Sequence, residues 1–368
     1  MARVTLDTVN KIYPSRHGPV HAVQDLDITI EDGEFVAVLG PSGCGKTSTL
    51  RMIVGLETIT GGTIRFDDRP VNELTPEQRN VAMAFETYAL YPNFTIAENL
   101  GFPLEVRGVD RKAREAEVLR VARLLRIEDI LGHKPAHLSG GQQQRVSLGR
   151  ALIRDPAVFI LDEVMSHLDA HLKLQMLFEL KRIHQSMGKT MVYVTHDQME
   201  ALALADRVAV MSNARLQQFG TRDELYHAPA NRFVADFIGE PPTNFFDAEV
   251  TETAGEIALA VPGTDLAFTT SPARVAALRN RGGKRAIVGI RPQNLFITPL
   301  DDAGSVTATV ALNEYLGEQS ILTFDDKGVS FRALAPPDAD AKTGATVAVR
   351  YRPADVMVFD TDTEALVA

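Results

Sequence analysis

The stretch GPSGCGKT, at residues 40–47, decides the fold of this chain. It follows the apolar run EFVAVLG, which is typical of a buried strand, and it precedes a segment that is compatible with a helix. A loop of the form G-x-x-x-x-G-K-[ST] in this strand–loop–helix setting binds phosphate. Its glycines let the backbone approach an anion, and the following helix points the positive end of its dipole at that anion. The sequence therefore predicts a nucleotide-binding α/β domain.

The loop supplies the groups that a nucleoside triphosphate with Mg²⁺ requires. The lysine offers a positive charge to the β- and γ-phosphates, and the following threonine hydroxyl can bind Mg²⁺. We expect one continuous run of residues to contact ATP, namely Gly40, Pro41, Ser42, Gly43, Cys44, Gly45, Lys46, Thr47 and Ser48. Asp162 and Glu163 end the apolar strand AVFIL, so we expect them beside this loop. Asp162 would hold Mg²⁺ through water, and Glu163 would act as general base towards the attacking water.

Strand-like and helical patterns alternate through the rest of the first part of the chain. The segments VTLDTVNKIY, HAVQDLDITI and GGTIRFDDRPV read as short strands. A helical pattern with an apolar stripe that includes Leu119 and Leu131 covers residues 110–131. The strand-like runs AVFILDE and TMVYVTHD are each followed by a helical segment, at residues 172–187 and 198–205. This alternation predicts a mostly parallel sheet with both faces covered.

The pattern changes near residues 237–246, where FIGEPPTNFF carries a proline pair. Beyond it lie the short β-type runs EIALAV, AIVGI, LFITP, TATVAL, SILTF, ATVAVRY and VMVFD. Closely spaced short strands predict a small β-barrel or sandwich. We therefore expect two domains, at residues 1–235 and 236–368.

Composition narrows the class of protein. The net charge of −10 argues against a nucleic-acid partner, which usually meets a basic surface. The single cysteine, Cys44, excludes an internal disulfide and suits a reducing compartment. No secretory signal and no apolar run of about 18 residues is expected to anchor the chain, so other subunits would have to supply any membrane span.

The segment LSGGQQQR, at residues 138–145, narrows the family further. Ser139 is a good N-cap, and the glycines after it leave the backbone of a helix start open to a phosphate. This segment resembles the signature of ABC ATPases. The resemblance implies that Ser139, Gly140, Gly141 and Gln142 close over ATP held by a facing subunit, in a head-to-tail dimer that sandwiches two ATP molecules.

Other motifs of that family follow in order. Tyr13 resembles the aromatic residue that stacks on adenine, Asp169 in SHLDA resembles the acid of the loop joining the two active sites, and His196 in VTHDQMEA resembles the switch histidine that reaches the γ-phosphate. Residues 88–135 look like the helical insert that touches membrane subunits. The resemblance covers about residues 3–235 and implies a P-loop ABC ATPase domain with an antiparallel β subdomain and this insert.

The C-terminal part resembles that of importer ATPases of the maltose, sn-glycerol-3-phosphate and polyol type, in which an OB-like β-barrel domain dimerises and regulates. FIGEPPTNFF and GIRPQNL carry this likeness. It implies an ATP-hydrolysing subunit that powers import of a sugar, a polyol such as glycerol, or glycerol phosphate. The implied partners are a second ATPase subunit, two transmembrane permease subunits and a periplasmic or extracellular solute-binding protein, with this chain peripheral on the cytoplasmic face of a bacterial inner membrane. An importer ATPase for a polyamine or a metal is the alternative.

Three positions depart from the family pattern. Glu86 stands where a glutamine touches Mg²⁺ and the attacking water, Val164 where proline is usual, and His167 where asparagine is common. A carboxylate at residue 86 is a good ligand for Mg²⁺. It also repels Glu163 or the γ-phosphate by about 4 kcal/mol per unit charge at about 4 Å and an effective dielectric near 20. We therefore expect Glu86 to take part in metal binding and catalysis, with turnover at its own site slow or strongly dependent on Mg²⁺.

Other arrangements stay open. Because residues 139–142 are intact, the chain could complete an ordinary partner's site in a heterodimer, whereas a homodimer would make Glu86 a tolerated variation. A regulatory subunit that binds ATP without hydrolysing it would also accommodate Glu86. Soluble ABC ATPases of translation or DNA repair usually carry two cassettes or a long coiled coil, which this sequence does not suggest.

Overall fold

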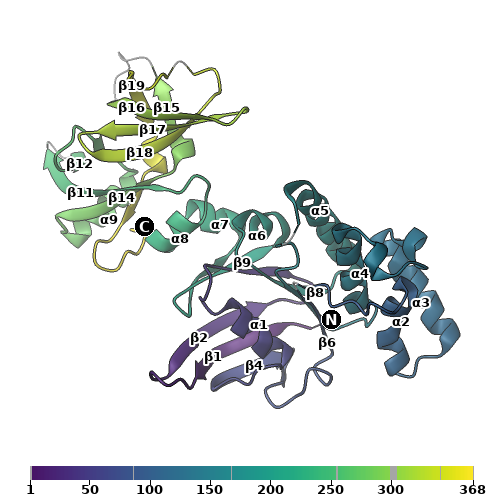
Figure 1. Ribbon diagram of the computed structural model, residues 1–368. Helices are drawn as coiled ribbons and strands as arrows, with labels where there is room; N and C mark the ends of the chain where they lie inside the picture. Colours follow the sequence, from purple (N-terminus) through teal and green to yellow (C-terminus); the bar gives the residue numbers. More distant parts are fainter. Residues whose placement is uncertain are drawn as a thin grey trace. The chain divides into compact units, whose positions relative to one another are not determined.

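The computed structural model describes residues 2–85, 87–166, 168–253, 256–298, 305–339 and 341–367. The chain divides into two compact units, Met1–Arg222 and Asp223–Ala368, whose elements are labelled in Figure 1. Internal contacts group residues 223–235 with the second unit. The domain boundary expected near residue 235 stays a prediction.

A six-stranded sheet forms the centre of the first unit, in the strand order β10-β9-β3-β8-β7-β6. Its strands are β3 (Phe35–Leu39), β6 (Val81–Ala84), β7 (Val158–Asp162), β8 (Thr190–Thr195), β9 (Arg207–Ser212) and β10 (Arg215–Gly220). All neighbouring pairs are parallel except β9 with β10, which form an antiparallel hairpin. The mostly parallel sheet expected from the sequence is present.

Alternate side chains of these strands enter two separate cores, because successive Cβ atoms point to opposite faces of a sheet. Phe35, Phe159 and Tyr193 pack on the face covered by the helices α2 (Ile96–Val106), α3 (Arg111–Leu125), α4 (Gly140–Leu152) and α5 (Ala170–Met187). Val38 and Ile160 pack on the opposite face, against α1 (Lys46–Val54) and a second sheet. Both faces are therefore covered, as expected.

The second sheet is antiparallel, in the order β2-β1-β4-β5. Its strands are β1 (Val4–Tyr13), β2 (Val20–Ile30), β4 (Gly61–Phe66) and β5 (Arg69–Pro70). These are the segments that the sequence predicted as short strands. α1 shares a core with this sheet and with the central sheet, so the start of α1 is held by two layers.

The helical insert comprises α2, α3 and the short turns η1 (Glu128–Ile130) and η2 (Pro135–His137). Figure 1 shows α2 and α3 beside α4, and the buried Gly149 of α4 permits this approach, because a Cβ there would lie 2.6 Å from Leu100 Cδ2. The helix expected over 110–131 ends earlier, at Leu125, where Arg126 adopts a φ of 55°. Leu119 is exposed, since the buried stripe runs through residues 118, 121, 122 and 125, at helical spacing.

The second unit is built from two five-stranded antiparallel sheets around one core, in the orders β13-β12-β11-β14-β20 and β15-β19-β16-β17-β18. The strands are β11 (Asn244–Thr253), β12 (Glu256–Ala260), β13 (Ala267–Phe268), β14 (Arg285–Ile290), β15 (Leu295–Thr298), β16 (Val306–Tyr315), β17 (Ser320–Asp326), β18 (Val329–Ala335), β19 (Thr346–Tyr351) and β20 (Met357–Phe359). Every β-type run expected beyond the proline pair is a strand. The helix α9 (Pro272–Arg281), which Ser271 caps, and the strands β11, β13 and β18 were not expected.

The motif GIRPQNL has a structural role in this unit. Arg291 is buried and donates hydrogen bonds to the carbonyl oxygens of Tyr226, at 2.7 and 3.1 Å, and of Ile238. Burial lowers the pKa of Arg291, yet the guanidinium finds carbonyl acceptors in several directions. It thereby joins β14 to the short helices α7 (Arg222–His227) and α8 (Arg232–Phe237).

Among the described residues, no helix combines the length and apolarity that crossing a membrane requires.

Candidate functional site

The phosphate loop lies between the end of β3 and the start of α1, as the sequence predicted. Gly43 and Gly45 adopt φ values of 80° and 107°, in the region that favours glycine. Gly45 is the N-cap of α1, and in the described chain no side chain caps this helix. The N–H groups of a first helical turn have no partner within the helix, so they can bind an anion.

Two glycines of the loop also lie too close to neighbouring backbone for any side chain. A Cβ on Gly45 would lie 2.2 Å from the carbonyl oxygen of Ala22, and a Cβ on Gly40 would lie 2.3 Å from that of Met211. The loop is therefore held against β2 and β9 by contacts that only glycine allows.

Lys46 is the buried cation of this loop. Its Nζ donates hydrogen bonds to the carbonyl oxygens of Gly40, at 2.8 Å, and Pro41, at 3.0 Å. These bonds fold the side chain back over the loop and hold the ammonium group against the loop backbone. The positive charge of Lys46 and the positive end of the α1 dipole therefore both lie at the phosphate loop.

Tyr13 lies beside the same helix start. Its hydroxyl is 3.5 Å from the Ser48 hydroxyl, and Lys11 Nζ is 4.7 Å from the centre of its ring. The end of β1 is therefore next to the first turn of α1. Tyr13, Ser48 and the phosphate loop form one group, as the sequence led us to expect.

Cys44 in this loop is buried, and it is the only cysteine of the chain. Burial raises the pKa of the thiol, although the nearby charge of Lys46 opposes this. Because the thiolate is the reactive form, we expect slow alkylation by iodoacetamide at pH 8, with a rate that still rises above about pH 10, where an ordinary thiol is almost fully ionised. Mass spectrometry of the intact chain at several pH values measures this rate. The urea-unfolded chain is the control, ATP should slow the reaction further, and a plateau below pH 8.5 would contradict the expectation.

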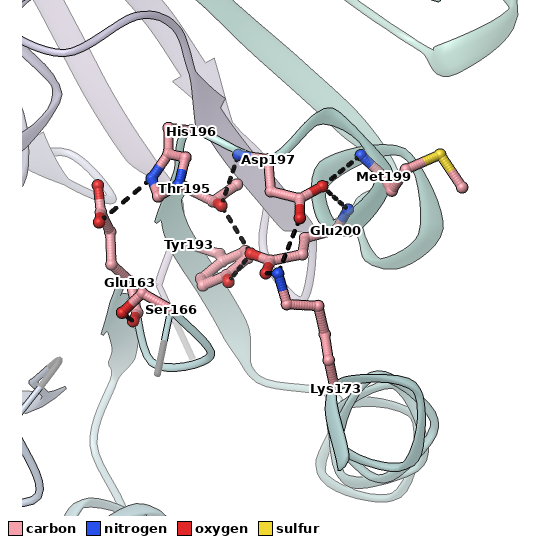
Figure 2. Close-up of polar contacts among 9 residues, drawn as sticks. All are labelled: Glu163, Ser166, Lys173, Tyr193, Thr195, His196, Asp197, Met199 and Glu200. Carbon is pink, nitrogen blue, oxygen red and sulfur yellow. Dashed lines mark hydrogen bonds and ion pairs between the residues drawn. The ribbon is translucent and has the colours of Figure 1, made fainter. Parts of the chain in front are cut away.

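Acidic residues and a histidine meet at the carboxyl ends of β7 and β8. Asp162 is the last residue of β7, and the N–H of Glu163 donates to the carbonyl oxygen of Val194 at 3.0 Å. Glu163 has a φ of 45°, an uncommon conformation for a residue with a side chain. Its Oε2 lies 3.3 Å from Nδ1 of His196 (Figure 2), and the two side chains are 26% and 57% exposed. The structure therefore brings the predicted base and the predicted switch histidine together, within reach of a ligand.

A buried polar network lies directly behind His196 and was missed by the sequence analysis (Figure 2). The carboxylate of Glu200 accepts hydrogen bonds from the Tyr193 hydroxyl and, at 2.6 Å, from the Thr195 hydroxyl. Lys173 Nζ lies 2.8 Å from Glu200 and 2.9 Å from Asp197. The only signal in the sequence was the acidic pattern of HDQME, which reads equally well as an ordinary helix start.

The segment LSGGQ begins α4. Ser139 is its N-cap and exchanges two hydrogen bonds with Gln142. The N–H of Gln142 donates to the Ser139 hydroxyl at 3.4 Å, and the N–H of Ser139 donates to Gln142 Oε1 at 3.0 Å. The expected N-cap is therefore present. Within the described ranges, no hydrogen bond or ion pair joins residues 139–142 to the phosphate loop.

Asp169 lies near this cap. It is the N-cap of α5 and accepts a hydrogen bond from the N–H of Leu172 at 3.0 Å. A Cβ on Gly141 would lie 3.4 Å from Leu172 Cδ2, so the first turns of α4 and α5 adjoin. The sequence-predicted residues thus form one group around the phosphate loop and another around the cap of α4.

The oxygen donors of the site fit Mg²⁺. The hydroxyl of Thr47 and the carboxylate of Asp162 are hard ligands, and Mg²⁺ is commonly held by only one or two protein groups together with phosphates and water. In the described part of the chain, no cluster of three or more histidine, cysteine or carboxylate side chains offers a site for a metal bound mainly by protein. Glu86, expected as a further ligand, and His167 lie outside the described residues.

Three family models match the chain. A model described as "ABC transporter" matches residues 23–166, a model of the MalK OB fold domain matches residues 239–295, and a model of the TOBE domain matches residues 288–359. The first match contains the phosphate loop, the cap of α4 and the Asp162–Glu163 pair. The other two lie in the second unit.

Curated relatives resemble the chain over nearly its whole length. It is 42% identical, over 99% of each chain, to the sulfoquinovosyl glycerol transport ATP-binding protein of Agrobacterium fabrum. It is 40% identical, over 99% of this chain and 95% of the relative, to an sn-glycerol-3-phosphate import ATP-binding protein of Rhizobium johnstonii. It is 41% identical, over 99% of each chain, to the trehalose/maltose import ATP-binding protein of Thermococcus litoralis.

A solved structure resembles the first part of the chain. It is a dimeric ATP-binding cassette in a post-hydrolysis state, bound to ADP and Pi, with a TM-score of 0.53 and 30% sequence identity. The match covers 59% of this chain and 98% of the cassette.

Proposed function

This chain belongs to the family of ABC transporter ATP-binding subunits, and we propose that it hydrolyses ATP to power uptake of a sugar, a polyol such as glycerol, or a glycerol phosphate. One observation supports this choice of solute class. Relatives named for transport or import of sulfoquinovosyl glycerol, sn-glycerol-3-phosphate and trehalose/maltose align with the chain from end to end, second unit included. The solutes for which these relatives are named are all polyhydroxylated.

Three residues of the site carry the proposed hydrolysis. Lys46 and the N–H groups at the start of α1 bind the β- and γ-phosphates. Glu163 takes the proton of the attacking water, and His196, at 3.3 Å from Glu163, contacts the γ-phosphate. The phosphate loop follows the end of β3, His196 follows β8 and Glu163 follows β7. Since β8 lies between β3 and β7, these three parts of the site lie along one edge of the sheet. Tyr13 stacks on the adenine.

Thr47 and Asp162 would hold Mg²⁺ at the phosphates, with Glu86 as a further ligand. When bound, the cation neutralises charge that develops on the phosphate oxygens. Within the chain itself, Lys46 serves the same electrostatic purpose at the loop.

We further propose a dimer in which the Ser139 cap covers the nucleotide of the partner subunit. The cap of α4 and the phosphate loop are not bonded to each other within the described chain, and each can present N–H groups to a phosphate. The similar solved cassette is dimeric. Asp169, close to the cap, would then lie between the two sites.

The remaining partners follow from the proposed transport. Two permease subunits would form the path through the membrane and would contact the helical insert, a solute-binding protein would deliver the solute, and this chain would lie on the cytoplasmic face of the membrane. The second unit would contribute to dimerisation and regulation.

Reconstitution tests the proposed function. The chain, its permease subunits and their solute-binding protein are placed in proteoliposomes with internal ATP, and uptake of radiolabelled glycerol, glycerol 3-phosphate and trehalose is measured. We expect ATP-dependent uptake of one of these compounds. Uptake of a polyamine or a metal ion instead would support the alternative importer class, and no ATP-dependent uptake of any of them would contradict the proposal.

The Glu86→Gln substitution tests the effect of the unusual carboxylate. We expect the variant at saturating Mg²⁺ to turn over ATP several-fold faster than the native chain, because the negative charge that repels Glu163 and the γ-phosphate is removed. It should need a higher Mg²⁺ concentration for half-maximal rate, because a carboxylate ligand of the cation is lost. ATPase assays over a Mg²⁺ series, with the chain alone and with its permeases, measure both. An unchanged, full rate from this single kind of ATPase subunit would exclude a slow site and a required heterodimer.

A further inference from the structure

Lys173 occupies a place that links two parts of the proposed site. It lies in the first turn of α5, where its N–H donates to the carbonyl oxygen of Asp169 at 2.8 Å. Its Nζ reaches across to Asp197 Oδ2, at 2.9 Å, and Glu200 Oε1, at 2.8 Å. Asp197 follows His196 directly and is the N-cap of α6 (Gln198–Leu204). One side chain therefore joins the start of α5 to the turn that carries His196 (Figure 2).

The carboxylate of Glu200 depends on this lysine. Its side chain is only 3% exposed, whereas that of Lys173 is 27% exposed. A carboxylate so deeply buried is unfavourable unless its charge is compensated, and Lys173 is the one cation among the described residues that forms an ion pair with it. The other donors to Glu200 are the uncharged hydroxyls of Tyr193 and Thr195. Removal of Lys173 would leave a buried negative charge with neutral donors.

The same network fixes the backbone on both sides of His196. The Thr195 hydroxyl donates to Glu200 and accepts a hydrogen bond from the N–H of Asp197 at 3.0 Å. Asp197 Oδ1 accepts from the N–H of Met199 at 2.8 Å and from that of Glu200 at 3.2 Å. Because the imidazole itself is largely exposed, its position follows from the backbone of this turn.

The charges of the network favour this arrangement. Burial acts against the charge of Lys173, but the hydrogen bonds and charges of Glu200 and Asp197 outweigh it and raise its pKa. Lys173 is therefore a cation at any pH at which the enzyme would work, and the ion pairs persist.

We propose that Lys173 is a positioning residue, whose ion pairs with Asp197 and Glu200 hold His196 at the correct place beside Glu163. The proposal rests on the proposed role of His196 in hydrolysis. It also gives the first turn of α5, which adjoins the cap of α4 through Leu172, a rigid connection to the histidine. If the cap of α4 and the loop of Asp169 move, Lys173 would transmit that movement to His196.

Substitution of Lys173 by methionine tests this positioning, because methionine keeps an unbranched side chain and removes the charge. We expect Lys173→Met to lower kcat by about 10- to 100-fold, as small misplacements of reacting groups do, with the KM for ATP changed by less than about threefold. Lys173→Arg, which keeps a cation, should recover at least half of the native kcat. Equal losses in both variants, or a loss confined to KM, would overturn the proposal.

Lys181 provides a matched control on the same helix. Its Nζ donates to the carbonyl oxygen of Leu204 at 2.7 Å and lies 3.4 Å from Asp206, so it joins α5 to the other end of α6 and does not touch the turn of His196. Lys181→Met should lower the melting temperature to a similar degree as Lys173→Met but leave kcat within about twofold of native. A similar fall of kcat in both variants would show that lost stability, not positioning, is responsible.

A double variant separates failure of this inference from failure of the proposed function. If Lys173 acts through His196, the kcat of His196→Ala/Lys173→Met should equal that of His196→Ala alone. A lowered kcat in His196→Ala with a further, multiplicative loss in the double variant would overturn the positioning role only. A native kcat in His196→Ala would remove the proposed role of His196 itself, and the inference with it.

Discussion

The Glu163→Gln variant should bind ATP as tightly as the native chain but hydrolyse it about 10²- to 10⁴-fold more slowly. Glutamine keeps the size of the side chain and the backbone position at the end of β7 but cannot take a proton from water. The carboxylate lies 3.3 Å from His196 and is partly exposed, so it can reach both a water molecule and its histidine neighbour. The loss should therefore appear in kcat, with little change in the KM for ATP.

A consequence for assembly follows from this arrested state. If hydrolysis opens the dimer, the variant with ATP and Mg²⁺ should elute as a dimer in size-exclusion chromatography and return to the native profile with ADP. Glu115→Gln, at an exposed ion pair of α3, is the matched control and should keep the native ATPase rate. Native ATPase activity in Glu163→Gln would show that another group is the base.

The Lys46→Ala variant should lose ATP binding itself. A charge-assisted hydrogen bond to phosphate contributes about 3 kcal/mol, so the dissociation constant for ATP should rise by about 100-fold or more. Equilibrium binding of a fluorescent ATP analogue measures this change. Because the buried Nζ also bonds the carbonyl oxygens of Gly40 and Pro41, a thermal unfolding curve is needed to show that the variant is folded.

The two variants should differ in a defined way. Glu163→Gln should keep binding and lose turnover, whereas Lys46→Ala should lose binding, and with it the ATP-dependent dimer. An affinity for ATP within twofold of native in Lys46→Ala would contradict the assignment of the phosphate loop.

The parts of the site that rest on local sequence could be predicted. The phosphate loop needs only the order strand, glycine loop and helix, and the structure places it between β3 and α1. Glu163 and His196 were each expected in the site, at the end of a strand-like run, and parallel neighbours bring their carboxyl ends to one edge of a sheet. Their direct contact was not predicted. The expected N-cap at Ser139 likewise depends on a few adjacent residues.

What depends on distant contacts could not be predicted. Lys173 and Glu200 are far apart in the sequence, and a lysine in an amphipathic helix ordinarily reads as a solvated charge. Arg291 lies within the motif GIRPQNL, but its carbonyl acceptors at Tyr226 and Ile238 come from other elements. The length of α3 was overestimated because apolar residues continue past Leu125, where the backbone reverses at Arg126.

In the β-rich second unit, too, features set by local sequence could be predicted better than those set by distant contacts. Seven of its strands were predicted from their composition, whereas β11, β13 and β18 were missed. How the strands pair could not be predicted, since register depends on partners elsewhere in the chain. α9 was missed because most of its apolar residues are alanines, and Leu278 alone is buried in it. The N-terminal capping serine and proline at residues 271–272 were the available signal.

A structure of the Glu163→Gln variant with ATP and Mg²⁺ is the most direct test of the whole account. We predict two subunits related head to tail, with each γ-phosphate contacted by Lys46 of one subunit and by Ser139 of the partner subunit. ATP enclosed by a single subunit, with the cap of the other far from it, would contradict this account.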